Sequence, residues 1–257
     1  MSHTVLFKWF KLAGPRVGSL LLLFLLFSSI GTPSALGQRK VSKSYPASKD
    51  VRVELKNISG TITVESWNKD QIKLTATFES PAATFTPRQL ENGLVIDLMG
   101  DNRGRGDVGN VNFRLQVPVN CAVDLETRRG NINVSNIRST LVRAHVSTEG
   151  DITLVNISAK HVIAQNLMGL ITFDGDFWIN GTYEFKSGQG EISIRIPHDS
   201  AFSLMAVAPA RKISLGQFWN NGFKTLGNGR KYVGDVGDGR ATVMVTNFRG
   251  GITFLRR

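Results

Sequence analysis

The chain has 257 residues, with 31 Lys and Arg against 20 Asp and Glu, and one cysteine. This length suffices for one domain with a sizeable core. The single cysteine excludes a framework of internal disulfides, so Cys121 is expected to be a small buried residue and not a reactive thiol. No helical pattern of useful length follows residue 37, so we expect an all-β fold.

Residues 1–37 predict a secretory signal peptide. Three basic residues precede the apolar run 20–27, and small residues lead to a cleavage site after Gly37. An uncleaved anchor is the alternative, but this run is short for a bilayer span of about 20 residues. Cleavage removes three of the 31 basic and none of the 20 acidic residues, which leaves a net charge of +8. We therefore expect an exported protein, located in the periplasm, on the outer cell surface or secreted.

The exported chain is expected to form one domain behind a short leader. Residues 38–49 are rich in Ser and Lys and predict a flexible leader. Apolar residues alternate with other residues in longer stretches across 50–118, which predict an antiparallel or mixed cap of strands. Such a cap covers strand edges that would otherwise pair with other chains. Residues 119–257 form the repeating part of the domain 50–257.

A glycine followed by an alternating apolar phrase recurs in the repeating part. The glycines are 20, 19 and 21 residues apart, and the phrases begin at Gly130, Gly150, Gly169 and Gly190. Such a period is typical of a parallel β-solenoid, whose ~20-residue coils bury their apolar sides by stacking. We expect flattened coils with two short strands and two corners each. The isoleucines two residues after the glycines are expected to be buried in register: Ile132, Ile152, Ile171 and Ile192.

The order of these features resembles a family of bacterial envelope proteins, the adhesin-like domains of unknown function. The resemblance covers residues 45–257, including the phrase at 57–62, the run at 117–127, the Gly-x-Ile coils and a closing coil at Gly251. It implies a right-handed parallel β-solenoid of the auto-transporter-adhesin type outside a bacterial membrane. Its motifs describe the fold, and it supplies no catalytic residue to carry over. The chain departs from the pattern before Gly150 and in the Gly-rich stretch 216–240, which leaves the number of coils there open.

A carbohydrate-active β-helix enzyme, a polysaccharide lyase or hydrolase, is the alternative function. Such an enzyme needs carboxylates that converge on one face. The acidic residues are scattered here, although Asp151 and Glu191 follow repeat glycines two coils apart. The histidines have no spacing of a metal site or catalytic triad. We predict no catalytic residue, metal or cofactor.

Positive charge marks the candidate binding face. Arg128, Arg129 and Lys160 stand beside inward-facing positions and should point outward. Stacked strands lie about 4.8 Å apart, so outward charges would form ladders that attract anionic polysaccharide, lipopolysaccharide or a membrane surface. The export signal argues against nucleic acid as partner, and the charges would alternatively serve solubility alone. The sequence thus favours an exported, non-enzymatic adhesin or ligand-binding surface, with its oligomeric state left open.

Overall fold

A computed structural model of the protein describes residues 39–48, 50–79 and 83–257. The chain divides into two compact units, Met1–Gly37 and Gln38–Arg257, and the described residues belong to the second. The predicted signal peptide 1–37 lies outside the described residues, and its cleavage stays a prediction. Within the described ranges, no helix has the length and apolar character needed to cross a membrane.

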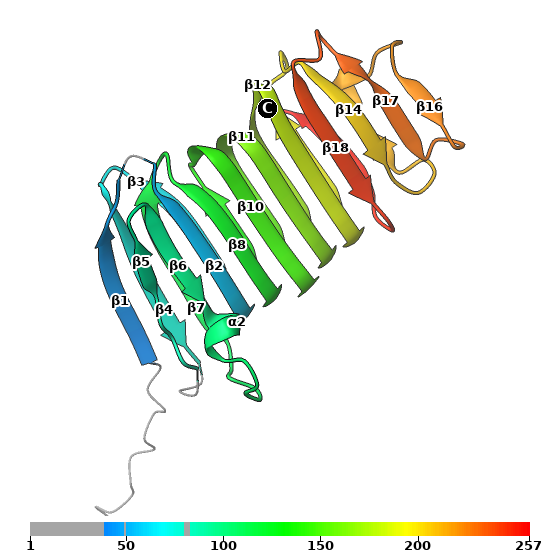
Figure 1. Cartoon of the computed structure of the whole chain (residues 1–257). Helices are drawn as coiled ribbons and strands as arrows, with labels where there is room; N and C mark the ends of the chain where they lie inside the picture. Colours follow the sequence, from blue (N-terminus) through cyan, green and yellow to red (C-terminus); the bar gives the residue numbers. More distant parts are fainter. Residues whose placement is uncertain (1–38, 49, 80–82) are drawn as a thin grey trace, which may run out of the picture. The chain divides into compact units, whose positions relative to one another are not determined.

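The described residues form an all-β structure in which nineteen strands join in one sheet (Figure 1). Its strands follow one another in two rows, and the long strands β11 (Ile152–Met168) and β12 (Ile171–Gln189) contribute their second halves to the first row and their first halves to the second. The first row runs in the order β5 (Arg88–Leu90), β6 (Gly93–Asp97), β2 (Arg52–Ser59), β8 (Ala122–Arg129), β10 (Arg138–Glu149), β11, β12, β18 (Ala241–Asn247), β14 (Phe202–Val207), β17 (Lys231–Val236) and β16 (Lys224–Leu226).

The second row covers the other side of the core. It runs in the order β1 (Arg39–Pro46), β4 (Gln71–Phe78), β7 (Val111–Pro118), β3 (Ile62–Trp67), β9 (Ile132–Ser135), β11, β12, β13 (Ile192–Ile196), β19 (Ile252–Arg256) and β15 (Ile213–Ser214). Single helical turns, α2 (Leu98–Asp101) and η1 (Gly216–Phe218), lie between strands. One continuous cluster of buried apolar side chains fills the space between the rows.

The expectation of a right-handed parallel β-solenoid is wrong. The sheet is nearly closed, and it is mixed because several strands pair antiparallel. These pairs are β4 with β1 and β7, β5 with β6, and β17 with β14 and β16. The order of strands also departs from the order of the chain: β2 lies between β6 and β8, and β18 lies between β12 and β14. Alternation of apolar residues has the same period in parallel and antiparallel strands, so the pattern alone does not determine which strands pair or in which direction.

The expected register of the repeat isoleucines is confirmed in the central strands. Ile132, Ile152, Ile171 and Ile192 follow one another as direct partners across β9, β11, β12 and β13. Each of the four side chains is 0 % exposed. The central strands β8, β10, β11, β12 and β18 lie side by side in Figure 1, and this regular part positions the candidate site.

The segment expected to be a flexible leader contains a strand. Residues Arg39–Pro46 form β1, which pairs antiparallel with β4 along its whole length. Val41 and Tyr45 are partly buried against the core, while their neighbours are exposed. The alternation is short and diluted by Ser and Lys, yet it is enough for a strand that packs one face only.

Candidate binding edge

The repeat glycines stack into one edge of the sheet, where the chain passes from the first row to the second. The glycine edge, as we call it, comprises Gly60, Gly130, Gly150, Gly169, Gly190 and Gly250. A Cβ atom on Gly150 would lie 2.1 Å from the carbonyl oxygen of Gly130, and its φ of 153° is rare for other residues. Only glycine lets neighbouring turns approach this closely. Close packing of backbone on backbone therefore forms this edge.

Buried polar side chains hold the glycine edge from the inside. The Asn247 Nδ2 group donates to the carbonyls of Gly190 at 2.7 Å and Gly251 at 2.9 Å. The Asn166 Nδ2 group donates in the same way to the Gly150 carbonyl at 3.1 Å. Each of these asparagines stands three residues before a glycine of the edge, Asn166 before Gly169 and Asn247 before Gly250. Their role is to satisfy backbone groups that the turns would otherwise bury without partners.

Side chains that follow the glycines brace the edge from the outside. Asn131 Oδ1 accepts a hydrogen bond from the Asp151 N–H at 2.9 Å, and Asp151 Oδ1 accepts one from the Leu170 N–H at 2.8 Å. Glu191 Oε2 accepts from the Gly251 N–H at 3.0 Å. Asp151 and Glu191 thus bind backbone groups of the next repeat.

A hollow of 580 Å³ opens at one end of this edge, and two arginines lie in its wall. We call it the arginine hollow; its lining residues are Ile58, Ser59, Glu79, Asp107, Gly109, Asn110, Arg128, Arg129 and Thr148. Arg128 and Arg129 are exposed at the end of β8. Neither arginine forms an ion pair with a residue in the described ranges. A second hollow of 470 Å³ continues along the edge from Arg129 to Gly169.

The structure does not place Lys160 with the two arginines. Arg129 pairs with Glu149 of β10, and Glu149 pairs with Met168 of β11, so the end of β11 at Met168 lies on the same side as the arginines. Lys160 lies in the middle of β11, eight residues before Met168. At about 3.3 Å per residue, eight residues of strand correspond to roughly 26 Å. The neighbouring Ala159 carbonyl accepts a hydrogen bond from the Tyr183 hydroxyl at 2.7 Å, which marks a structural corner. The predicted face therefore contains Arg128 and Arg129 only.

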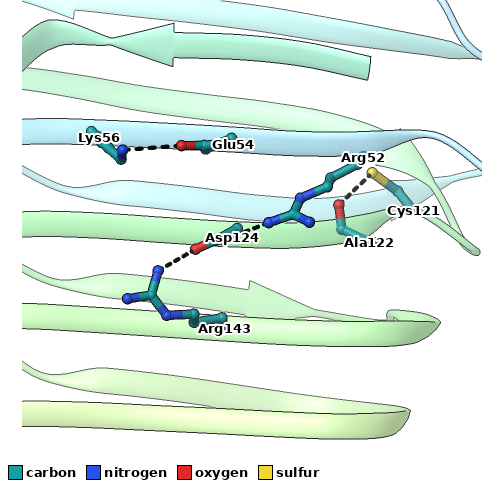
Figure 2. Close-up of polar contacts among 7 residues, drawn as sticks. All are labelled: Arg52, Glu54, Lys56, Cys121, Ala122, Asp124 and Arg143. Atoms are coloured by element: carbon teal, nitrogen blue, oxygen red, sulfur yellow. Dashed lines mark hydrogen bonds and ion pairs between the residues drawn. The ribbon is translucent and has the colours of Figure 1, made fainter. Parts of the chain in front are cut away.

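Two other arginines that the repeats carry outward, Arg143 and Arg195, are paired with carboxylates. Figure 2 shows Asp124 held between Arg52 and Arg143, with one carboxylate oxygen 2.7 Å from each guanidinium. On the second row, the Asp174 carboxylate lies 3.3 Å from Arg257 and 4.0 Å from Arg195. A continuous basic ladder is therefore absent from these two faces of the described sheet. At the glycine edge, Arg128 and Arg129 share their hollow with the carboxylates of Glu79 and Asp107.

Sequence reasoning missed a group of apolar side chains on the same edge. Leu167, Met168, Leu170 and Phe248 are 53, 40, 48 and 61 % exposed. Leu167 and Phe248 each stand two residues before a repeat glycine. Arg128 stands at the same position in its own repeat. Comparing these positions between repeats would have revealed them. In the described residues, no group of three or more His, Cys, Asp or Glu side chains is arranged to hold a metal ion.

Comparisons with known proteins support a likeness of fold. No protein-family model and no curated protein matches the chain. Among solved structures, a candidate cell adhesion protein from Clostridium sporogenes covers 86 % of this chain and 100 % of its own, at 13 % identity and a TM-score of 0.50. A candidate adhesin from Bacteroides fragilis is 10 % identical over 85 % of this chain and 98 % of its own, with a TM-score of 0.30. At such identities, the likeness to the Clostridium protein extends to the fold alone.

Proposed function

We propose that the protein is an exported, non-enzymatic binding protein of the bacterial cell envelope, and that the arginine hollow holds an anionic glycan. One observation carries the proposal: two adjacent exposed arginines, without ion pairs among the described residues, line a 580 Å³ hollow. Guanidinium groups bind carboxylate, sulfate or phosphate through paired hydrogen bonds. The predicted signal peptide and the resemblance to adhesin-like envelope proteins support the location.

The acidic residues that line the hollow suit the hydroxyl groups of a sugar. Glu79 accepts hydrogen bonds from the side chains of Asn110 at 2.7 Å and Asn112 at 3.2 Å, and Asp107 accepts from the Gly109 N–H at 2.9 Å. Each carboxylate retains acceptor capacity for a ligand hydroxyl. A ligand that carries both anionic groups and hydroxyls therefore fits this wall and the arginines better than a simple anion does.

The test compares binding to immobilised acidic and neutral polysaccharides. Replacing Arg128 and Arg129 together by Ser should weaken binding to the acidic polysaccharide about tenfold or more, since each hydrogen bond to a charged group contributes about 1.5–3 kcal/mol. Binding by the parent protein should also fall steeply with salt, because the Debye length shrinks from about 10 Å at 0.1 M to about 3 Å at 1 M.

The matched control is Lys160→Ser, which removes an exposed cation far from the hollow and should leave binding unchanged. Melting temperatures of all variants should stay close to that of the parent, because exposed charges contribute little stability. Binding that ignores both salt and the double substitution would contradict the proposal. Vesicles with anionic headgroups but no glycan serve as a further arm, which separates a sugar ligand from a lipid phosphate.

The enzymatic alternative has less support from the arrangement of carboxylates. Asp151 and Glu191 are bound to backbone N–H groups, and Arg257 contacts both Asp174 and Asp176. These four carboxylates form hydrogen bonds or ion pairs within the fold. Incubating the purified protein with acidic polysaccharides and measuring reducing ends should give no product above background; sustained release of oligosaccharides would refute the non-enzymatic assignment.

A further inference from the structure

The glycine edge carries a second feature, which is apolar and separate from the arginine hollow. Leu167, Met168, Leu170 and Phe248 form what we call the apolar patch, and each of these side chains is at least 40 % exposed. The two positions that Leu167 and Met168 occupy before Gly169 hold Ile58-Ser59, Arg128-Arg129, Thr148-Glu149 and Gly188-Gln189 before Gly60, Gly130, Gly150 and Gly190. Large apolar side chains gathered on an exposed edge are uncommon in soluble domains and mark interaction sites.

Gly188, which has no side chain, leaves a gap in the apolar patch. It lies in the repeat between Leu167 and Phe248, and its position opens two adjoining hollows of 360 and 300 Å³, both lined by Leu167, Gly188 and Phe248. A Cβ atom on residue 188 would lie 2.5 Å from the Leu167 carbonyl oxygen and 3.0 Å from Leu167 Cδ1. Leu167 and Phe248 therefore project as two separated apolar points with a gap between them.

Two cations flank the apolar patch. Lys186 Nζ lies 5.8 Å from the centre of the Phe248 ring, and Arg249 lines one of the two hollows. Neither Lys186 nor Arg249 forms an ion pair with a residue that the structure describes. Apolar side chains beside unpaired Lys and Arg are the combination found where proteins lie on anionic membranes.

We infer that the apolar patch docks on the surface of a lipid bilayer that contains anionic lipids. Phe248, Leu167, Met168 and Leu170 enter the boundary between headgroups and acyl chains, while Lys186 and Arg249 contact the anionic headgroups. A protein partner fits less well, because four side chains that are about half exposed offer less than the ~800 Å² that each partner of a standard complex buries. This inference goes beyond the proposed glycan binding and uses different residues.

Vesicle sedimentation tests the inference. The purified protein should sediment with vesicles of phosphatidylcholine and phosphatidylglycerol, and much less with phosphatidylcholine alone. Replacing Leu167 and Phe248 together by Gln should lower the vesicle affinity tenfold or more. The matched control is Ile179→Gln, which changes a side chain that is 62 % exposed on β12 but outside the patch and should leave the affinity unchanged. Lys186→Ser with Arg249→Ser should abolish most of the preference for anionic vesicles.

A second measurement reports how deeply position 248 enters the bilayer. Tryptophan introduced by Phe248→Trp should be quenched by lipids brominated on the acyl chain, whereas tryptophan introduced by Ile179→Trp should not. Unchanged sedimentation of the Leu167 and Phe248 double variant, or no quenching at position 248, would overturn the inference. Sedimentation that is lost only with Arg128→Ser and Arg129→Ser would overturn it too, and would assign lipid headgroups to the arginine hollow instead. Loss of self-association in the Gln variant, with vesicle binding intact, would assign the patch to a second copy of the chain.

Discussion

Burial controls the chemistry of Cys121, the one cysteine of the chain. Its side chain is 0 % exposed, as the sequence predicts, and its thiol donates a hydrogen bond to the Ala122 carbonyl at 3.4 Å (Figure 2). Burial raises the pKa of the thiol to about 12, against about 8.5 in an unfolded chain. Folding therefore favours the protonated thiol. This contribution to stability is complete below pH ~8.5 and is lost as the pH rises towards 12.

The raised pKa predicts slow alkylation of the native protein. At pH 8.5 the thiolate fraction of Cys121 should be roughly a thousandfold lower in the folded than in the unfolded chain, and only the thiolate reacts. Mass spectrometry after treatment with iodoacetamide should show little labelling in buffer and full labelling in concentrated urea. Cys121→Ala gives the background in both states. Equal rates of labelling in buffer and in urea would show that the thiol is accessible and ionised.

At the scale of the strands, the stacked isoleucines carry much of the packing between the rows. Ile152 lies in β11 between Ile132 of β9 and Ile171 of β12, and all three are 0 % exposed. Replacing Ile152 by Asp places a carboxylate among apolar side chains without a partner. We expect this change to lower the free energy of unfolding by several kcal/mol. Thermal melting and urea titration followed by circular dichroism measure the loss.

Thr153→Asp is the matched control for that substitution. Thr153 is the next residue of β11, and its side chain points to the opposite, outer face of the second row, as the alternation of burial in this strand shows. The same carboxylate in solvent should change the melting temperature only slightly. If Ile152→Asp melts with the parent while it remains folded, the register of the central strands is wrong.

The glycine period and the alternation were sufficient to predict which side chains of the central strands face inward. They were not sufficient for the direction or the spatial order of strands outside that part. β18 directly precedes the closing phrase at Gly251, yet it inserts between β12 and β14. β17 lies within the Gly-rich stretch 216–240 and runs antiparallel to β14. Such pairings depend on contacts between distant segments, which a local pattern does not contain.

The candidate site was predictable in part for a related reason. Arg128 and Arg129 stand directly before a repeat glycine, so their place at the turn follows from the period. Lys160 stands between two alternating runs, and its distance from the glycine edge became evident only when β11 proved to be one continuous strand. Phe248 was overlooked because it is far from Leu167 in the sequence. It follows β18, which pairs with β12 in the sheet and so brings Phe248 to the same edge.

At the scale of the whole molecule, β1 limits where the predicted signal peptide can be cleaved without loss of a strand. β1 pairs with β4 over residues Arg39–Pro46 and so covers backbone groups that would otherwise form an open edge. Lys40 and Lys43 on β1 are exposed, and charged residues on an edge strand discourage pairing with another chain. Cleavage after Gly37 would leave this strand intact. Cleavage ten residues later would remove it.

We therefore expect a mature protein that begins near Gln38 when the full gene is expressed in a bacterial host. N-terminal sequencing of the exported fraction measures this directly, and recovery of intact Met1 in the membrane fraction would show that residues 1–37 act as an anchor.

A variant that keeps the signal but lacks residues 38–47 tests the role of β1. Without β1, the backbone N–H and C=O groups of β4 lose their partners, so this variant should aggregate at concentrations where the parent stays monodisperse in light scattering. A soluble, equally stable deletion variant would show that β1 does not protect the edge of the sheet.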